Sequence, residues 1–140
     1  MGRVVGLDVG DRRIGVAVSD ALGITAQRLT VIERTARLED DLAAIARVAE
    51  EQHAEAIVVG LPLTMQGEQG TQAKKIVSFA GALRTRVSCP VELLDERLTT
   101  AQGQRALLET DASRARRKEL IDQVAAQLIL QHYLDGKANR

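Results

Sequence analysis

The sequence predicts an α/β fold in which a five-stranded mixed sheet, an antiparallel meander followed by parallel strands, carries helices on both faces. Two observations support this prediction. Three apolar runs with strand character follow one another through short connections in the first third of the chain. Beyond them, short apolar runs alternate with segments whose apolar residues recur at helical spacing.

Composition limits the class of protein. The 140 residues, 45% of them hydrophobic, fit a single domain over residues 1–140 with a full-sized core. No segment approaches the roughly 20 apolar residues of a membrane span, and the start lacks a signal peptide, so we expect a cytoplasmic protein with no membrane partner. The single cysteine, Cys89, excludes an internal disulfide and is expected to be a buried small hydrophobe. A net charge of zero does not point to a nucleic-acid binder.

The first three strands are predicted at Arg3–Val9, Arg13–Ser19 and Ala26–Glu33. Turns at 10–12 and 20–23 join them into an antiparallel meander. Along the second strand, large apolar residues alternate with Gly15, Ala17 and Ser19. One face of this strand is therefore expected to pack large side chains, and the other to admit close approach of a helix or ligand.

Alternating helices and strands follow. A helix ending near His53 is predicted by apolar residues at helical spacing, which are Leu38, Leu42, Ile45 and Ala49. The continuous apolar run Ala56–Val59 is typical of a parallel strand covered on both faces. A second helix is indicated by Ala73, Ile76, Val77, Ala80 and Leu83. Val91–Asp95 is predicted as the fifth strand.

A polar segment after the fourth strand is predicted to be a mobile substrate loop. It leaves the strand at Gly60, Leu61 and Pro62 and can bend at Gly67 and Gly70. Segments with so little apolar material belong to the least stable parts of a fold. We expect this loop to lie over the substrate strand.

The last part of the chain is predicted to be helical. Thr99 and Gln102 form a possible capping box for a helix through Leu108, and a long final helix is predicted from Arg114 to Leu134. The complete order of elements is that of the ribonuclease H-like arrangement, in which the first strand is central and its acid faces a cleft.

Asp8 is the most informative residue, because it lies inside the apolar run of the first strand. Burying an unpaired carboxylate is costly, so Asp8 is expected to have a partner. A divalent cation, a phosphate held through a cation, and an arginine are the three candidates.

Two further segments place acids where they could join Asp8. Asp95 and Glu96 lie where the fifth strand ends. Asp122 on the last helix falls about 20° beyond Ile129 around the helix axis, at the border of the core. Carboxylates from three elements suit hard cations such as Mg²⁺ or Mn²⁺, and two such ions can promote in-line phosphodiester cleavage.

Recognition of nucleic acid would have to use phosphates and shape, because Phe79 and Tyr133 are the only aromatic residues. His53 and His132 are interpreted as helix-end or packing residues. Basic residues gather in three places. We expect the phosphate contacts to come from Arg12, Arg13, Arg97, Arg114, Arg116, Arg117 and Lys118, whereas Lys74 and Lys75 are as readily explained as solvated charges.

Four motifs in order resemble the YqgF family, also called RuvX. They are GLDVGDRRIGVAVSD at Gly6–Asp20, VVGLPLTMQG at Val58–Gly67, DERLTT at Asp95–Thr100 and IDQVAAQLIL at Ile121–Leu130. That family is described as Holliday junction resolvases and as nucleases that process the 5′ end of the precursor of 16S ribosomal RNA. The motifs span nearly the whole chain.

The resemblance implies a ribonuclease H-like fold, a divalent metal, Mg²⁺ or Mn²⁺, and catalytic and metal-binding acids at Asp8, Glu96 and Asp122. It implies RNA or branched DNA as partner and action on pre-ribosomal particles. The protein is expected to act as a monomer or a weak homodimer. Two departures from the better-characterised resolvases matter. At the end of the fourth strand, where they carry a catalytic glutamate, this chain has Gly60-Leu61-Pro62, so Glu96 must substitute for it. On the last helix, Ala125 stands in place of a second acid.

Three other functions stay open at this point. A Holliday junction resolvase would use the same acids on branched DNA. An RNA-binding ribosome assembly factor without catalysis would keep the fold with a degenerate site. An ATPase of the actin-like or sugar-kinase type would share the Asp-x-Gly strand, but needs a second related domain that 140 residues cannot supply.

Overall fold

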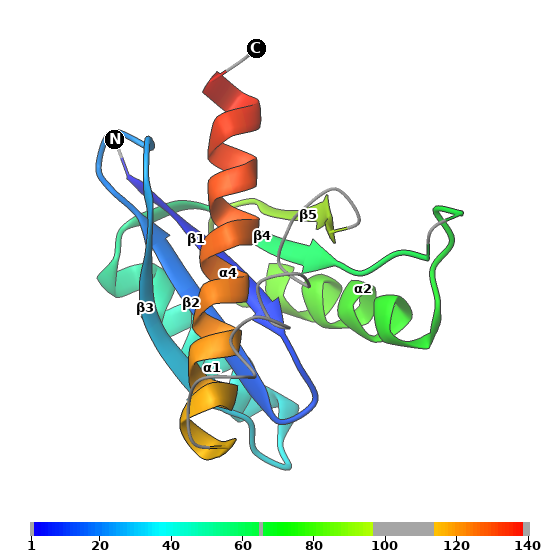
Figure 1. Ribbon diagram of the computed structural model, residues 1–140. Helices are drawn as coiled ribbons and strands as arrows, with labels where there is room; N and C mark the ends of the chain where they lie inside the picture. The colour runs from blue at the N-terminus through cyan, green and yellow to red at the C-terminus, as the bar shows by residue number, and fades with distance from the viewer. Residues whose placement is uncertain (1, 65, 97–113, 139–140) are drawn as a thin grey trace.

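The computed structural model describes residues 2–64, 66–96 and 114–138 (Figure 1). In chain order its elements are β1 (Arg3–Val9), β2 (Arg13–Ser19), β3 (Ala26–Glu33), α1 (Leu38–Glu51), β4 (Ala54–Leu61), α2 (Thr71–Arg84), β5 (Val91–Asp95) and α4 (Arg114–Ala138). The helix predicted from Thr99 through Leu108 lies outside the described residues. None of the helices described is long and apolar enough to cross a membrane.

The five strands form one mixed sheet in the order β3-β2-β1-β4-β5. β1 is antiparallel to β2 and parallel to β4, and β4 is parallel to β5. The predicted meander, the parallel continuation and the central position of the first strand are thereby confirmed.

β4 is longer than the sequence predicts. Its pairing with β5 continues through Gly60, opposite Leu94, and Leu61, opposite Asp95. The assignment of Gly60 and Leu61 to the loop was therefore wrong, because the backbone groups of these residues complete a parallel ladder with a strand 30 residues further along the chain.

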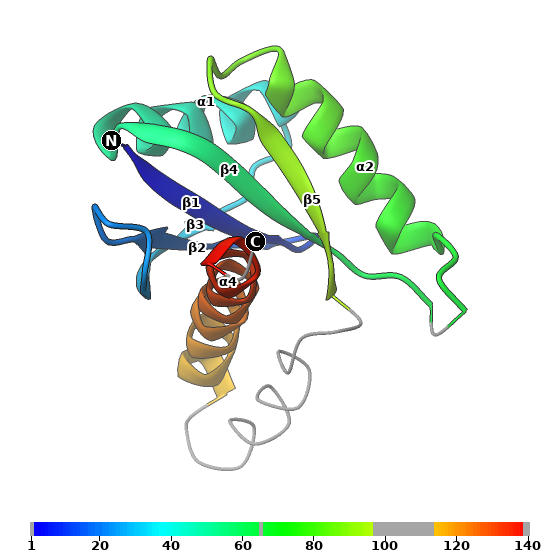
Figure 2. The ribbon, with the colours of Figure 1, turned by 90° about the horizontal axis from the view of Figure 1, so that it is seen from above.

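Helices cover both faces of the sheet, with α1 and α2 on one side and α4 on the other (Figure 2). Val5, Leu7 and Val9 of β1 face α1 and α2 in the larger core cluster, whereas Val4 belongs to the cluster beneath α4. Cys89 packs against the larger cluster and is partly buried, not fully buried as the sequence suggested. Burial raises the pKa of its thiol.

Glycines let α4 lie unusually close to the sheet. A β-carbon at Gly6 would come within 2.7 Å of Leu130 Cβ, and one at Gly60 within 2.5 Å of Ile129 Cδ1. At Gly15 a β-carbon would collide with the backbone carbonyl of Asp122. The close approach expected at the small-residue face of the second strand is therefore made by α4.

Candidate active site

Three acids from three elements line one pocket of about 300 Å³, which we call the acid pocket. Asp8 comes from β1, Glu96 follows β5, and Asp122 comes from α4. The remaining lining residues are Val9, Gly10, Pro62, Gln72, Ile76 and Ile121. The structure thus brings the three predicted acids to one place, although 114 residues separate the first from the last.

Asp8 and Asp122 are neighbours because of Gly15. Asp8 pairs with Gly15 across the β1–β2 ladder, and Gly15 lies directly against the backbone of Asp122. Side chains alternate along a strand, so Asp8 shares its face with Val4 and Gly6, which lie beneath α4. The first and third acids therefore meet where helix and sheet are closest.

Glu96 reaches the pocket above Gly60. A β-carbon at position 60 would lie 2.7 Å from Oε1 of Glu96, and that oxygen is buried. The Glu96 carboxylate therefore occupies space that a side chain on β4 would take.

Asp122 is held by an arginine. Arg13 Nε donates a hydrogen bond of 3.0 Å to Asp122 Oδ2, and the two side chains are 22% and 23% exposed. The sequence predicted Arg13 as a phosphate contact and did not predict this ion pair. Among the side chains that the structure describes, no three acidic, histidine or cysteine residues are grouped so that they could hold a metal ion.

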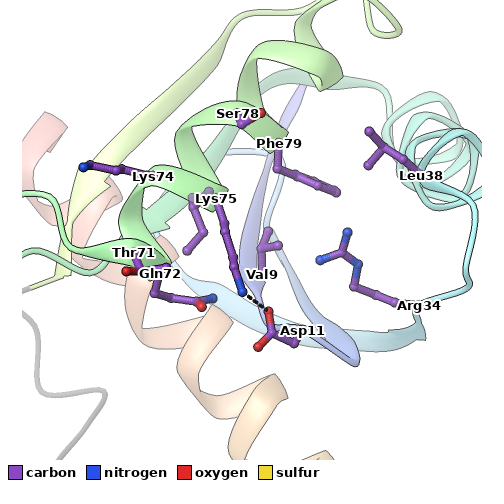
Figure 3. A pocket seen from close by; sticks show the side chains of 11 residues that line it. Val9, Asp11, Arg34, Leu38, Thr71, Gln72, Lys74, Lys75, Ser78 and Phe79 are labelled. Atoms are coloured by element: carbon purple, nitrogen blue, oxygen red, sulfur yellow. Dashed lines mark ion pairs between the residues drawn. The ribbon is translucent and has the colours of Figure 1, made fainter.

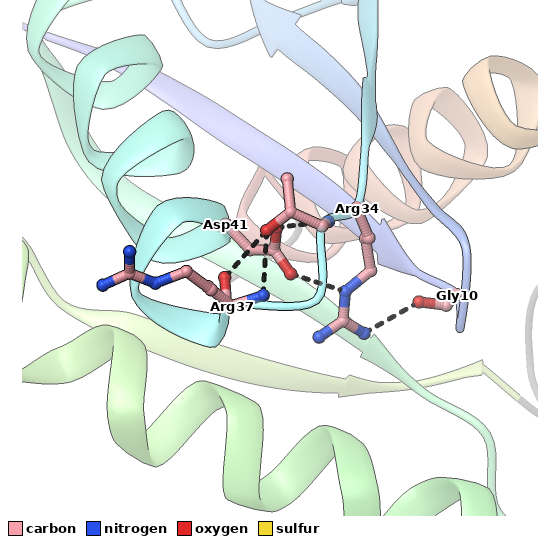
Figure 4. Close-up of polar contacts among 5 residues, drawn as sticks. Gly10, Arg34, Arg37 and Asp41 are labelled. Atoms are coloured by element: carbon pink, nitrogen blue, oxygen red, sulfur yellow. Dashed lines mark hydrogen bonds and ion pairs between the residues drawn. The ribbon is translucent and has the colours of Figure 1, made fainter.

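An ion pair between the partly exposed Arg34 and the buried Asp41 fixes the wall of the acid pocket (Figure 4). Arg34 donates from Nε to Asp41 Oδ2 at 3.1 Å and from Nη1 to the carbonyl of Gly10 at 3.0 Å. Asp41 also accepts hydrogen bonds of 2.8 and 3.0 Å from the backbone and hydroxyl of Thr35. The turn between β1 and β2 is thereby tied to the start of α1.

The pKa of Asp41 is lower than that of an ordinary aspartate. Burial opposes this shift, because it favours the neutral acid, but the hydrogen bonds from Thr35 and Arg34 together outweigh burial. This ion pair was not predicted from the sequence. Its signal, an acid in the first turn of a helix shortly after an arginine, looks the same as a solvated charge.

The other predicted basic residues are placed less completely. Arg12 is exposed in the turn between β1 and β2, and Arg97 lies outside the described residues. Arg114, Arg116, Arg117 and Lys118 begin α4, and only their backbone is described. Their phosphate contacts stay predictions.

The connection between β4 and α2 is a turn closed by its own hydrogen bonds. Thr64 N–H donates to the Glu68 carbonyl at 2.9 Å, and Gly67 N–H to the Thr64 carbonyl at 2.8 Å. Gly67 has φ +83°, a value that favours glycine, and Gly70 is the residue before α2. Pro62 lines the acid pocket. Movement of this segment over substrate stays a prediction.

A second and larger pocket of about 540 Å³ adjoins the acid pocket (Figure 3). We call it the adjoining pocket. Val9, Gln72 and Ile76 line both pockets. This cavity was not predicted from the sequence, because its walls come from β1, α1, α2 and the turns between them.

Comparison with known proteins gives a consistent result. The family model described as "RuvX: Holliday junction resolvase" matches residues 2–136. A Myxococcus xanthus protein named "Putative pre-16S rRNA nuclease" is 54% identical over 134 residues, covering 96% of this chain and 88% of the relative. A Moorella thermoacetica protein of the same name is 53% identical over 133 residues, covering 95% and 94%.

Solved structures support the fold. RuvC of T. thermophilus in complex with a Holliday junction substrate aligns with a TM-score of 0.62 at 16% identity, covering 99% of this chain and 97% of the other. A further Thermus thermophilus RuvC structure gives 0.59 at 18% identity, with 98% and 96% covered. These alignments confirm the predicted ribonuclease H-like fold.

Proposed function

This chain belongs to the RuvX family, and from that premise we propose that it is a nuclease that hydrolyses phosphodiester bonds of structured nucleic acid. We take its substrate to be the 5′ end of the precursor of 16S ribosomal RNA, processed in the cytoplasm during ribosome biogenesis. The observation that carries the proposal is that Asp8, Glu96 and Asp122, from three elements, line one pocket.

The donor atoms of this pocket fit a hard divalent cation, because they are carboxylate oxygens. Asp8, Glu96 and Asp122 line the pocket without forming a ready set of metal ligands, and binding of Mg²⁺ or Mn²⁺ would draw their three carboxylates together. When bound, such an ion stabilises negative charge on the phosphate and lowers the pKa of water. Asp122 is shared with Arg13, so metal binding and this ion pair compete for one carboxylate.

The surrounding residues have positioning roles in this proposal. Gly15 and Gly60 permit the short distances that bring α4 and Glu96 over the sheet. Arg34 holds the Gly10 carbonyl at the pocket wall. Arg13 lies beside the acids and, when released from Asp122, can donate charge-assisted hydrogen bonds to a phosphate oxygen.

A Holliday junction resolvase is the second candidate function. It is favoured by the description of the matching family model, and the same acids would act on a branched DNA. A third candidate is an RNA-binding assembly factor that does not cleave. These three functions differ in substrate and in turnover, so one assay separates them.

The test compares cleavage of an RNA spanning the 5′ end of the 16S precursor with cleavage of a four-way DNA junction, during a titration of Mn²⁺. Asp8→Asn serves as the matched variant, because it keeps the side-chain shape and removes the charge. We expect wild type to cut the RNA and Asp8→Asn to lose at least a hundredfold in rate. Selective cutting of the junction would favour the resolvase, and binding without cleavage would overturn the nuclease proposal.

A further inference from the structure

The adjoining pocket combines an apolar floor with a cationic rim. Val9, Ile76 and Phe79 are buried at its floor, being 5%, 3% and 4% exposed. Arg34 and Lys75 lie at its edge. The volume of about 540 Å³ falls in the range of roughly 300–1,000 Å³ of small-molecule sites.

The two cationic side chains differ in how firmly their partners hold them. Arg34 is fixed by Asp41 and Gly10, and its guanidinium carbon lies 5.1 Å from the centre of the Phe79 ring. Lys75 extends across the pocket toward Asp11 (Figure 3), with 3.7 Å between Nζ and Oδ1. Both side chains of this second pair are more than half exposed. Such surface pairs are weak, so Lys75 can exchange Asp11 for a phosphate at little cost.

We propose that the adjoining pocket binds one nucleotide of the substrate strand beside the scissile phosphate, with the base on the apolar floor and the phosphate at Lys75. The proposal rests on the nuclease function proposed above. It follows from the shared wall: Val9, Gln72 and Ile76 line both pockets, so a strand crossing the acids enters the adjoining pocket next. Proteins that recognise RNA by sequence commonly use unstacked bases in this way.

The chain supplies a matched pair of lysines for the test. Both lysines line the adjoining pocket. Figure 3 shows the amino group of Lys75 directed across it toward Asp11, and that of Lys74 directed away from Asp11. Removing one phosphate contact lowers both the affinity and its salt dependence. We expect Lys75→Ala to weaken RNA binding about three- to tenfold with a shallower salt slope, and Lys74→Ala to change neither by as much as twofold.

Binding of the base on the apolar floor is tested by filling the pocket with a larger side chain. Ser78 lines the pocket and is exposed, so Ser78→Trp fills space without disturbing the core, which a thermal unfolding curve checks. Binding is measured without added metal on RNAs that carry a single abasic nucleotide at successive positions around the cleavage site. At one position the abasic nucleotide is expected to weaken RNA binding by the wild type about fivefold or more. Ser78→Trp is expected to bind that abasic RNA as tightly as it binds the intact RNA.

The outcomes separate the two proposals. If wild type cleaves RNA while the abasic series is flat, or if Lys75→Ala equals Lys74→Ala, the nucleotide pocket is wrong and the nuclease stands. If one abasic position and Lys75→Ala both weaken RNA binding but no cleavage occurs, the nucleotide-pocket proposal stands and the nuclease proposal does not. Failure of wild type to bind the RNA at all overturns the pocket proposal.

Discussion

Arg13 of β2 and Asp122 of α4 form an ion pair of 3.0 Å at the acid pocket. The two residues are 109 positions apart in the chain. Their pairing places a fixed positive charge on a carboxylate that would otherwise face Asp8 and Glu96 across a small pocket. Arg13 reduces the electrostatic repulsion between the carboxylates that line this pocket.

Removing Arg13 is expected to strengthen cation binding. In Arg13→Ala no ion pair with Asp122 has to be broken before the cation binds. Mn²⁺ should therefore bind about three- to tenfold more tightly, as measured by titration calorimetry. Arg12→Ala, an exposed neighbour in the same turn, is the control and should leave the affinity unchanged. Weaker Mn²⁺ binding in Arg13→Ala would mean instead that Arg13 is needed to orient Asp122.

Gly15→Ala is expected to destabilise the fold by about 2–3 kcal/mol, because the new methyl group collides with the Asp122 backbone and pushes α4 from the sheet. Gly81→Ala is the matched control: nothing lies within 4 Å of a β-carbon there, inside α2. That change should stabilise by about 0.5–1 kcal/mol. Urea unfolding measures both, and equal effects would contradict the close packing at Gly15.

Gly60 and Glu96 are expected to be coupled. Glu96→Ala should lower cleavage at least tenfold, because it removes one of the three acids. Gly60→Glu introduced into Glu96→Ala places a carboxylate from β4 in the space that Glu96 vacates, and we expect it to restore part of the rate. Gly60→Gln in the same background tests whether charge is needed. Equal rates for the two double variants would refute the coupling.

Asp41→Asn is expected to lower stability at neutral pH by about 3 kcal/mol, since Arg34 loses its charged partner in a buried site. The folded-state pKa of Asp41 lies below the ordinary value of 3.8. The stabilisation is therefore complete above that value and is lost as pH falls through the folded pKa.

The measurement for Asp41 is urea unfolding from pH 7 to pH 2. The gap between wild type and Asp41→Asn should be constant down to about pH 4 and should then narrow. Asp40→Asn, at an exposed position on the same helix turn, should stay within about 0.5 kcal/mol of wild type. A gap that does not change with pH would show that the loss in Asp41→Asn comes from shape and not from charge.

The sequence by itself determined the strands whose signals are local. Arg3–Val9, Arg13–Ser19, Ala26–Glu33 and Val91–Asp95 have the predicted bounds, because apolar patterning and turn residues mark both ends of each strand. The antiparallel meander, the central first strand and the fold class followed from the order of these elements. The resemblance to the family rested on four sequence motifs, which can be compared with other sequences without a structure.

Only the tertiary structure decided which side chains meet. Gly60 and Leu61 became strand residues because β5 supplies partners for their backbone. Arg13 became the partner of Asp122, and Arg34 that of Asp41, through contacts that no local pattern specifies. The physical reason is the same in each case: periodicity reports which face of an element is apolar, whereas an ion pair or a shared pocket depends on how closely distant elements approach. Here glycines beneath α4 set that approach.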